Sequence, residues 1–255
     1  MSAIEEHLGQ ANHSRWPEYF VLAEKSLAIC RGYEPQIVID PDHPQKVHAA
    51  AFFAKLLRDA EAALLLLKFG VVSQARSVLR VAIECEITLA KCCKSPEFCE
   101  AYRIVAEKER LRLLKGIRRV NPGDFDEVKD VINEEMVNKL ADALRGVPEK
   151  KLEQWATEVG MGTLYQTGYR LYSADVHSGA SCLQHFLNYD LSGFASGVNW
   201  TPTETDCRVE LTEVSRVAIN GLSLAGNLFG LTHDEAFKQH LVEHHRLEEL
   251  VEKEG

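Results

Sequence analysis

One short stretch of the chain, YQTGYRLYSADVHSGAS at residues 165–181, brings together side chains that can act on a phosphate. Placed on a helix at 100° per residue, Gln166, Arg170, Ser173 and His177 fall within an arc of about 60° and form one polar row. An imidazole transfers protons near neutral pH, and a guanidinium stabilises negative charge developing on phosphate oxygens. The row therefore predicts metal-independent phosphodiester chemistry, with His177 as acid/base, Arg170 as phosphate stabiliser and Ser173 orienting the phosphate.

A simpler interpretation of the same stretch stays open. His177 can instead end the helix, be stabilised by the helix C-terminus, and hydrogen-bond to a buried carboxylate such as Glu84. In either case, an aromatic and apolar row beside the polar one is expected to pack on the rest of the protein. Its members are Tyr165, Tyr169, Tyr172 and Val176.

A second polar row interrupts an otherwise apolar helix expected over residues 73–94. On the helical wheel its members share one narrow arc: Ser73, Arg76, Arg80, Glu84 and Lys91. Because buried charges need partners, the row predicts either an internal ion-pair seam that fixes helix register, or a cleft where Arg76 or Arg80 binds an anion. Glu86 falls on another side, where we expect the edge of the bundle.

Two resemblances connect these rows to known families. Arg170 followed after six residues by His177 resembles the signature of the HEPN superfamily, although Leu171 stands where active members commonly carry a polar residue. Members of that superfamily are small helical bundles, often metal-independent ribonucleases that act as dimers in bacterial toxin and defence systems. This resemblance implies RNA as substrate, a homodimer, and a protein partner encoded nearby.

The second resemblance covers about residues 55–189. The pairing of ARxxxRxxxE (75–84) with YxxxSxxxHxG (169–179) is similar to a family of bacterial helical proteins catalogued only as a domain of unknown function. That similarity implies that six residues belong to one site, and it implies no activity. The six are Arg76, Arg80, Glu84, Tyr169, Ser173 and His177.

Two further groups of side chains have weaker functional interpretations. A basic stripe at helical spacing predicts either a solvated face or the path of an RNA backbone, and consists of Lys108, Arg112, Lys115 and Arg119. Near the C-terminus, His240, His244 and His245 include an i, i+4 pair suited to a metal, but they lack the H-E-x-x-H order of zinc hydrolases. We expect an exposed helix there, and no metal or cofactor.

Composition limits the class of protein. The 255 residues are 45% hydrophobic and 26% charged, with a formal net charge of -9, which disfavours a general nucleic-acid coat or an anionic membrane as partner. The seven cysteines are scattered among apolar residues without a C-x-x-C pair, as is typical of reduced intracellular thiols. Without an apparent signal peptide or membrane span, the chain is predicted to be cytoplasmic.

The periodicity predicts an all-α protein of about seven to nine helices without a significant sheet. Expected helices cover 16–30, 45–69, 73–94, 96–120, 124–144, 148–159, 163–177, 205–229 and 232–253. A core bundle is predicted over 45–190, from the helices at 45–69, 73–94, 96–120 and 163–177. Residues 1–44 are expected to form an N-terminal helix and a Pro-rich connector, and 191–255 a loop and a C-terminal helical hairpin packed on the core.

Two functions follow from these patterns. The first is a HEPN-like, metal-independent endoribonuclease or a degenerate relative, with Arg170, Ser173 and His177 as catalytic residues and Arg76 or Arg80 assisting. The second is a non-catalytic helical binding or regulatory module, in which the same arginines, Glu84, Ser173 and His177 form a buried structural network. Both require the helices that carry the two polar rows to touch.

Overall fold

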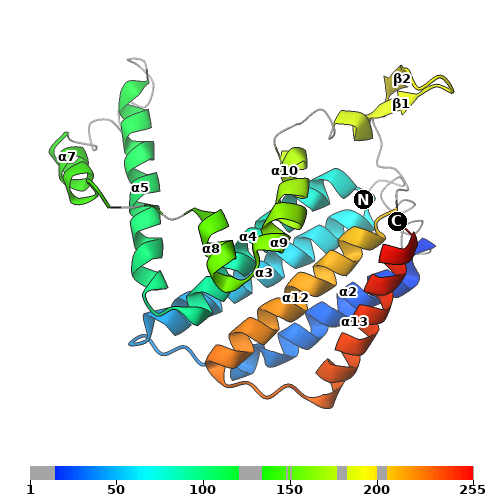
Figure 1. Ribbon diagram of the computed structural model, residues 1–255, viewed down its shortest axis with the longest axis horizontal. Helices are drawn as coiled ribbons and strands as arrows, with labels where there is room; N and C mark the ends of the chain where they lie inside the picture. Colours follow the sequence, from blue (N-terminus) through cyan, green and yellow to red (C-terminus); the bar gives the residue numbers. More distant parts are fainter. Residues whose placement is uncertain are drawn as a thin grey trace.

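The computed structural model describes residues 15–120, 134–147, 149, 151–176, 183–199 and 206–254, and these form an all-α, multi-helix fold with one small sheet. Four long helices lie side by side, and a fifth flanks them (Figure 1). The four are α2 (Pro17–Tyr33), α3 (Pro44–Lys68), α4 (Val72–Lys94) and α12 (Arg208–Phe229), and the fifth is α13 (Glu235–Glu254). The prediction of an all-α bundle is confirmed.

The hydrophobic core lies between these four long helices. It includes Phe20 of α2, Leu56 of α3, Leu79 of α4 and Leu211 of α12, all fully or almost fully buried. The helices approach closely, since a Cβ added to Gly221 of α12 would lie 3.0 Å from the Cδ2 atom of Leu56. Helix α2, before residue 45, and helix α12, after residue 191, therefore belong to the same core as α3 and α4.

Helix α5 (Phe98–Arg119) was predicted to be part of the core, and only its first turns are. Phe98 is buried in the main core, and Tyr102 and Val105 pack against it. The later part of α5 extends away from the bundle together with α7 (Glu134–Ala143) (Figure 1). Leu114 and Val137 form a separate small cluster between the two. Charged side chains occupy much of α5 beyond Val105, which leaves too narrow an apolar stripe to bury.

Helices α3 and α4 form the predicted antiparallel hairpin. Gly70 lies in the turn with φ of 71°, a left-handed conformation that glycine adopts at little cost. Helix α4 begins at Val72, one residue before its predicted start, and it has no side-chain cap. Ser73 instead donates its hydroxyl hydrogen to Asp175, more than a hundred positions away in the sequence.

The stretch with the first polar row continues from α8 (Leu152–Val159) and packs along α4. It consists of α9 (Gly162–Leu164), the π-helical segment η2 (Tyr165–Tyr169) and α10 (Arg170–Val176). Gly168 permits close packing, because a Cβ there would lie 3.2 Å from the Cδ1 atom of Ile83. The helix was predicted as regular, and the π segment is a local departure at the contact with α4.

Beyond α10, the small sheet is a two-stranded antiparallel hairpin of β1 (Leu187–Tyr189) and β2 (Ala195–Val198), with Leu187 paired to Val198. The segment around it was predicted to be non-helical, and the short strands are consistent with the absence of a significant sheet. Single turns of 3-10 helix precede β1 and follow α2, at η3 (Gln184–Phe186) and η1 (Glu34–Gln36).

Helix α13 begins at Glu235, three residues later than the helix predicted from residue 232. The cap is Asp234, whose Oδ1 atom accepts a hydrogen bond from the Phe237 backbone N–H at 2.9 Å. The backbone N–H of Asp234 in turn donates to the Tyr33 hydroxyl at 2.9 Å, which attaches the start of α13 to the end of α2. Within the described residues, no helix combines the length and the apolar character needed to cross a membrane.

Candidate functional site

The two polar rows meet where α10 packs on α4, and Arg80 is the centre of the contact. Its Nε atom donates to Ser173 Oγ at 3.1 Å, and its Nη2 atom donates to the Tyr169 hydroxyl at 2.5 Å. The guanidinium carbon also lies 4.5 Å from the centroid of the Tyr169 ring, within the range of a cation–π contact. The predicted contact between these two helices is confirmed.

Arg76 lies one turn earlier on α4 and pairs with a carboxylate that the sequence did not indicate. Its Nε atom lies 2.7 Å from Oε1 of Glu210, a residue of α12 that is only 2% exposed. The other oxygen of Glu210 is buried without a hydrogen-bond partner among the described residues. Burial opposes the charge of Arg76, but the neighbouring Glu210 outweighs it and raises the arginine pKa.

Glu84 is not the buried carboxylate that the simpler interpretation required. Its side chain is 47% exposed, and its Oε2 atom lies 3.6 Å from Nη1 of Arg80. Ser73 and Asp175 provide the third link between α4 and α10, through a hydrogen bond of 2.9 Å. Polar contacts from α4 to α10 therefore run along two turns of α4, with Glu84 at their solvent-exposed end.

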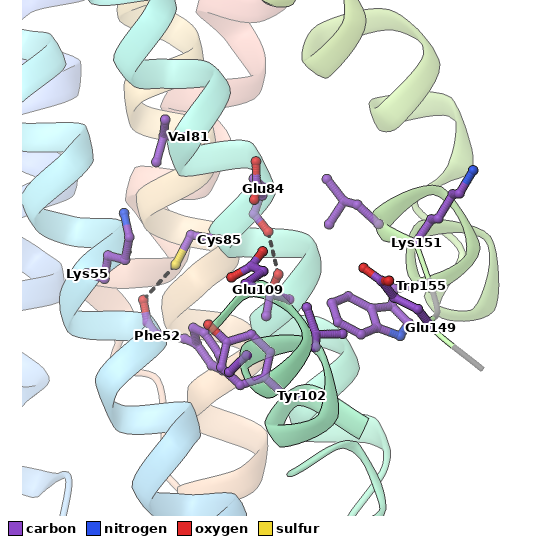
Figure 2. A pocket seen from close by; sticks show the side chains of 14 residues that line it. Phe52, Lys55, Val81, Glu84, Cys85, Tyr102, Glu109, Glu149, Lys151 and Trp155 are labelled. Carbon is purple, nitrogen blue, oxygen red and sulfur yellow. Dashed lines mark hydrogen bonds between the residues drawn. The ribbon is translucent and has the colours of Figure 1, made fainter. Parts of the chain in front are cut away.

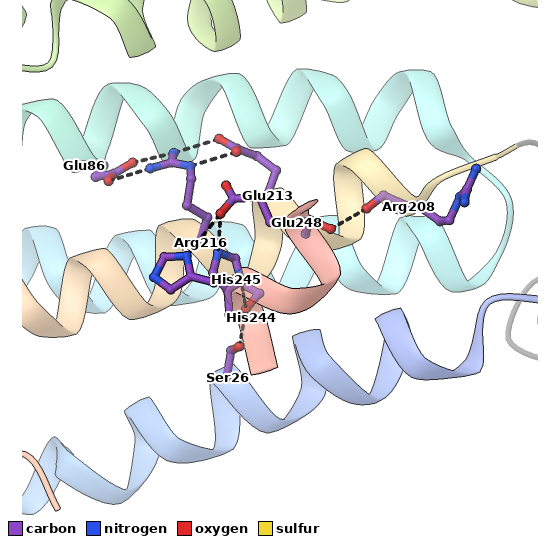
Figure 3. Close-up of polar contacts among 10 residues, drawn as sticks. Ser26, Glu86, Arg208, Glu213, Arg216, His244, His245 and Glu248 are labelled. Carbon is purple, nitrogen blue, oxygen red and sulfur yellow. Dashed lines mark hydrogen bonds and ion pairs between the residues drawn. The ribbon is translucent and has the colours of Figure 1, made fainter. Parts of the chain in front are cut away.

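The buried carboxylate of α4 is Glu86, which was expected at the bundle edge. It is completely buried, and Arg216 of α12 donates to both of its oxygens at 3.0 and 2.8 Å (Figure 3). Arg216 also donates to both oxygens of Glu213 at 2.8 and 2.7 Å. Burial raises the pKa of Glu86, and the Arg216 guanidinium opposes this shift. No local signal could have revealed this triad, since Glu86 and Arg216 are 130 positions apart.

Members of the first polar row differ in their exposure to solvent. Arg170 and Gln166 are exposed and hydrogen-bond to one another at 2.9 Å, and Gln166 donates to Glu153 at 3.0 Å. Ser173 is half-buried against Arg80, because it lies at the edge of the row nearest the tyrosines, about 60° from Arg170. The structure thus brings Ser173 to Arg80 and leaves Arg170 apart from both; His177 lies outside the described residues.

The neighbouring aromatic row packs on the bundle as predicted, except at its end. Tyr172 is buried, and its burial raises the pKa of its hydroxyl well above the ordinary range. Tyr165 and Tyr169 are half-buried, and their rings stack with centroids 4.9 Å apart. Val176 is 40% exposed, because the row reaches the end of the contact with α4.

The basic stripe on α5 is used in part to hold another segment of the chain. Lys108 donates to the backbone carbonyl of Val147, and Arg112 pairs with Glu149 at 2.5 Å. Lys115 and Arg119 are exposed. Lys108 and Arg112 therefore have a structural role, and the whole stripe lies on α5.

The C-terminal histidines were expected on an exposed helix, which is wrong for two of the three. His240 and His244 are 1% and 3% exposed, because serines of the long helices face them. Ser26 Oγ lies 2.7 Å from His240 Nε2 and 2.6 Å from Ser215 Oγ, and Ser215 Oγ lies 3.0 Å from His244 Nδ1. Figure 3 shows Ser26, in the middle of this chain of contacts, below His244 at one end of it.

Burial has a direct effect on these imidazoles. Desolvation, followed by the charge of Lys25, lowers the pKa of His240 from 6.5 to about 4. Desolvation also lowers the pKa of His244. Both rings are therefore neutral at physiological pH.

His244, exposed His245 and Glu248 present ligand atoms within 4.8 Å of one another and could hold a metal ion, with Ser215 fixing the His244 ring.

The cysteines are free thiols across the part of the chain that the structure describes, as predicted. Cys30, Cys85, Cys92 and Cys207 are buried, and Cys182 lies outside the described residues. Burial raises the pKa of Cys30 and of Cys85 to about 12, so both are protonated and poor ligands for a metal.

Together, the fold and the polar contacts define an all-α protein in which arginines of α4 and α12 join three helices through carboxylates, hydroxyls and a tyrosine. The chain belongs to a family of unknown function, DUF5677, whose model matches residues 46–194. The matched range contains Arg80, Tyr169 and Ser173, in agreement with the resemblance found in the sequence. It ends before α12, which supplies the partners of Arg76 and Glu86. No curated protein and no solved structure matches the chain.

Proposed function

We propose that this protein is a non-catalytic helical binding module, in which the polar network is structural and holds α10 and α12 on α4. The main support for this proposal is the set of contacts that the Arg80 guanidinium makes within the protein. Its guanidinium is only 18% exposed, donates to Ser173 and Tyr169, and lies 3.6 Å from Glu84. An arginine that binds a substrate phosphate needs donors directed toward solvent, whereas these are directed at the protein.

The charges around Arg80 support the same function. Glu84 and Glu210 pair with Arg80 and Arg76, and Asp175 accepts a hydrogen bond from Ser73, so carboxylates offset the positive charge of this contact and weaken its attraction for a phosphate. On the α5 side, Glu109 and Glu149 line the same pocket as Glu84, and Glu149 pairs with Arg112 of the basic stripe. A nucleic-acid backbone extending from that stripe to α10 would cross this acidic surface, which disfavours RNA as the ligand.

One observation favours a second candidate, a HEPN-like metal-independent endoribonuclease. Ser173, four positions before His177 in the sequence, accepts a hydrogen bond from Arg80. In this candidate, Arg80 stabilises the phosphate in place of exposed Arg170, and His177 acts as acid/base. RNA as substrate, a homodimer and a toxin or defence setting belong to this candidate.

The two candidates are separated by testing cleavage and stability on the same variants. For a structural network, wild-type protein cleaves no RNA in the presence of EDTA. Arg80→Ala lowers the free energy of unfolding by about 1–3 kcal/mol, because it removes hydrogen bonds to partly buried groups. Arg170→Ala is the matched control on the exposed face, and we expect a change of less than about 0.5 kcal/mol. EDTA-resistant cleavage that His177→Ala abolishes at unchanged stability would overturn the proposal and establish the ribonuclease.

A further inference from the structure

A pocket of about 350 Å³ lies between α3, α4, α5 and α8, on the side of α4 where Glu84 is exposed (Figure 2). Its volume is within the range of small-molecule sites in proteins. Two kinds of side chain line it and matter for recognition: the aromatic rings of Phe52, Tyr102 and Trp155, and the carboxylates of Glu84, Glu109 and Glu149.

The aromatic side of the pocket is held in place by edge-to-face and tilted contacts. The rings of Phe52 and Tyr102 are 5.1 Å apart at 86°, and those of Tyr102 and Trp155 are 6.5 Å apart at 42°. Phe98 packs behind them, 5.1 Å from Trp155. Because α3, α5 and α8 each contribute a ring, this side of the pocket is formed before a ligand arrives.

The pocket lining holds three carboxylates and two lysines. Of the two lysines in the lining, Lys55 is paired with Asp59 at 2.6 Å, and the Lys151 amine is directed away from the cavity in Figure 2. Glu149 is paired with Arg112. Glu109 forms no ion pair with the described residues, and its carboxylate lies between Glu84 and Tyr102 in Figure 2.

Tyr102 is affected by these carboxylates. Burial raises the pKa of its hydroxyl, and Cys85, Glu109 and Glu84 raise it further. The pocket therefore combines an aromatic surface with the carboxylate of Glu109, which has no ion pair among the described residues, while Lys55 is paired and the Lys151 amine is directed away.

We propose that this pocket binds a small organic cation, an ammonium group carried on an apolar or aromatic body. The ammonium group lies between Glu84 and Glu109, where it forms charge-assisted hydrogen bonds or ion pairs. The body stacks on Tyr102 and Trp155, where rings attract a cation and bury apolar surface. This inference deepens the proposed binding function and rests on it.

The position of Glu84 connects the ligand to the rest of the network. Glu84 lies at 3.6 Å from Arg80, which holds Tyr169 and Ser173 of the segment leading into α10. A cation that attracts Glu84 weakens its pairing with Arg80, because one carboxylate is shared between two positive charges. Ligand binding is therefore coupled to the contact between α4 and α10.

The test uses benzylammonium as the probe, with benzyl alcohol as its neutral counterpart and benzoate as its anionic one. Binding to the full chain is measured by isothermal titration calorimetry and by tryptophan fluorescence. We expect saturable binding of benzylammonium, at least about tenfold tighter than either counterpart, since an ion pair of about 1.4 kcal/mol gives this ratio. Thermal unfolding should also shift upward with benzylammonium concentration.

Two matched variants locate the site. Glu109→Gln removes an exposed carboxylate of the pocket and should reduce the affinity about tenfold at unchanged circular dichroism. Glu100→Gln removes an exposed carboxylate from the same helix, outside the pocket, and should leave binding unchanged. Equal binding of the three probes, or equal affinity in the two variants, would overturn the inference. If the cation inference fails, the proposed function is still tested separately by RNA cleavage and by the stability of Arg80→Ala, because neither measurement involves a cation.

Discussion

Acidification should destabilise this protein through the buried histidines of α13. His240 is almost fully buried, with Nε2 on Ser26 and Nδ1 without a hydrogen-bond partner among the described residues. Lys25 and His244 disfavour its protonated form, and Glu243 favours it. Burial and these neighbouring charges therefore make protonation of His240 less favourable in the folded protein than in the unfolded chain.

The size of the effect follows from the two pKa values. The pKa of His240 is about 4 in the folded protein, against 6.5 as its ordinary value. Below pH 6.5 the unfolded chain binds a proton that the folded chain does not, so stability falls as the pH falls toward 4. The contribution of His240 amounts to about 2 kcal/mol lost by about pH 5, and to about 3 kcal/mol in full. His244, whose pKa is also lowered, adds a loss of the same sign.

The measurement is urea denaturation followed by circular dichroism at several pH values between about 7.5 and about 5. His240→Gln should reduce the pH dependence of the unfolding free energy by about 2 kcal/mol over this range, whatever its effect on stability at neutral pH. His245→Gln is the comparison variant, since the His245 side chain is 66% exposed, and it should change the pH dependence by less than His240→Gln does. If His240→Gln retained the full wild-type dependence, the assignment of the effect to His240 would be refuted.

Two further predictions test the core. Arg216→Met leaves the fully buried Glu86 without its cation and should lower the free energy of unfolding by about 3–5 kcal/mol. The double variant Glu86→Leu/Arg216→Met should lose clearly less stability, because it leaves no unpaired charge at Glu86. A double-mutant cycle measured by urea denaturation tests this difference. Gly221→Val inserts a side chain where α12 meets α3 and should lower the free energy of unfolding by about 1–3 kcal/mol, measured by urea denaturation. Gly116→Val is the control, since a Cβ there would meet nothing within 4 Å, and it should change stability by much less. Equal effects of the two variants would contradict the packing of α12 in the core.

The sequence by itself determined the helices. Apolar periodicity, together with glycine and proline positions, placed α3 and α12 within three residues of their observed bounds at both ends, because helix formation and termination depend on nearby residues. The grouping of Arg80 with Ser173 came from the resemblance of ARxxxRxxxE and YxxxSxxxHxG to a known family, and the hydrogen bond between the two side chains agrees with it.

Only the tertiary structure decided which partner each buried polar group has. Arg76 pairs with Glu210 at a separation of 134 positions, and Ser26 meets His240 at a separation of 214. A helical wheel reports which face of a helix is buried, but it carries no information about the distant side chain that satisfies a charge on that face. For the same reason, the wheel placed Glu86 at the bundle edge, whereas the approach of Arg216 on α12 makes its burial stable.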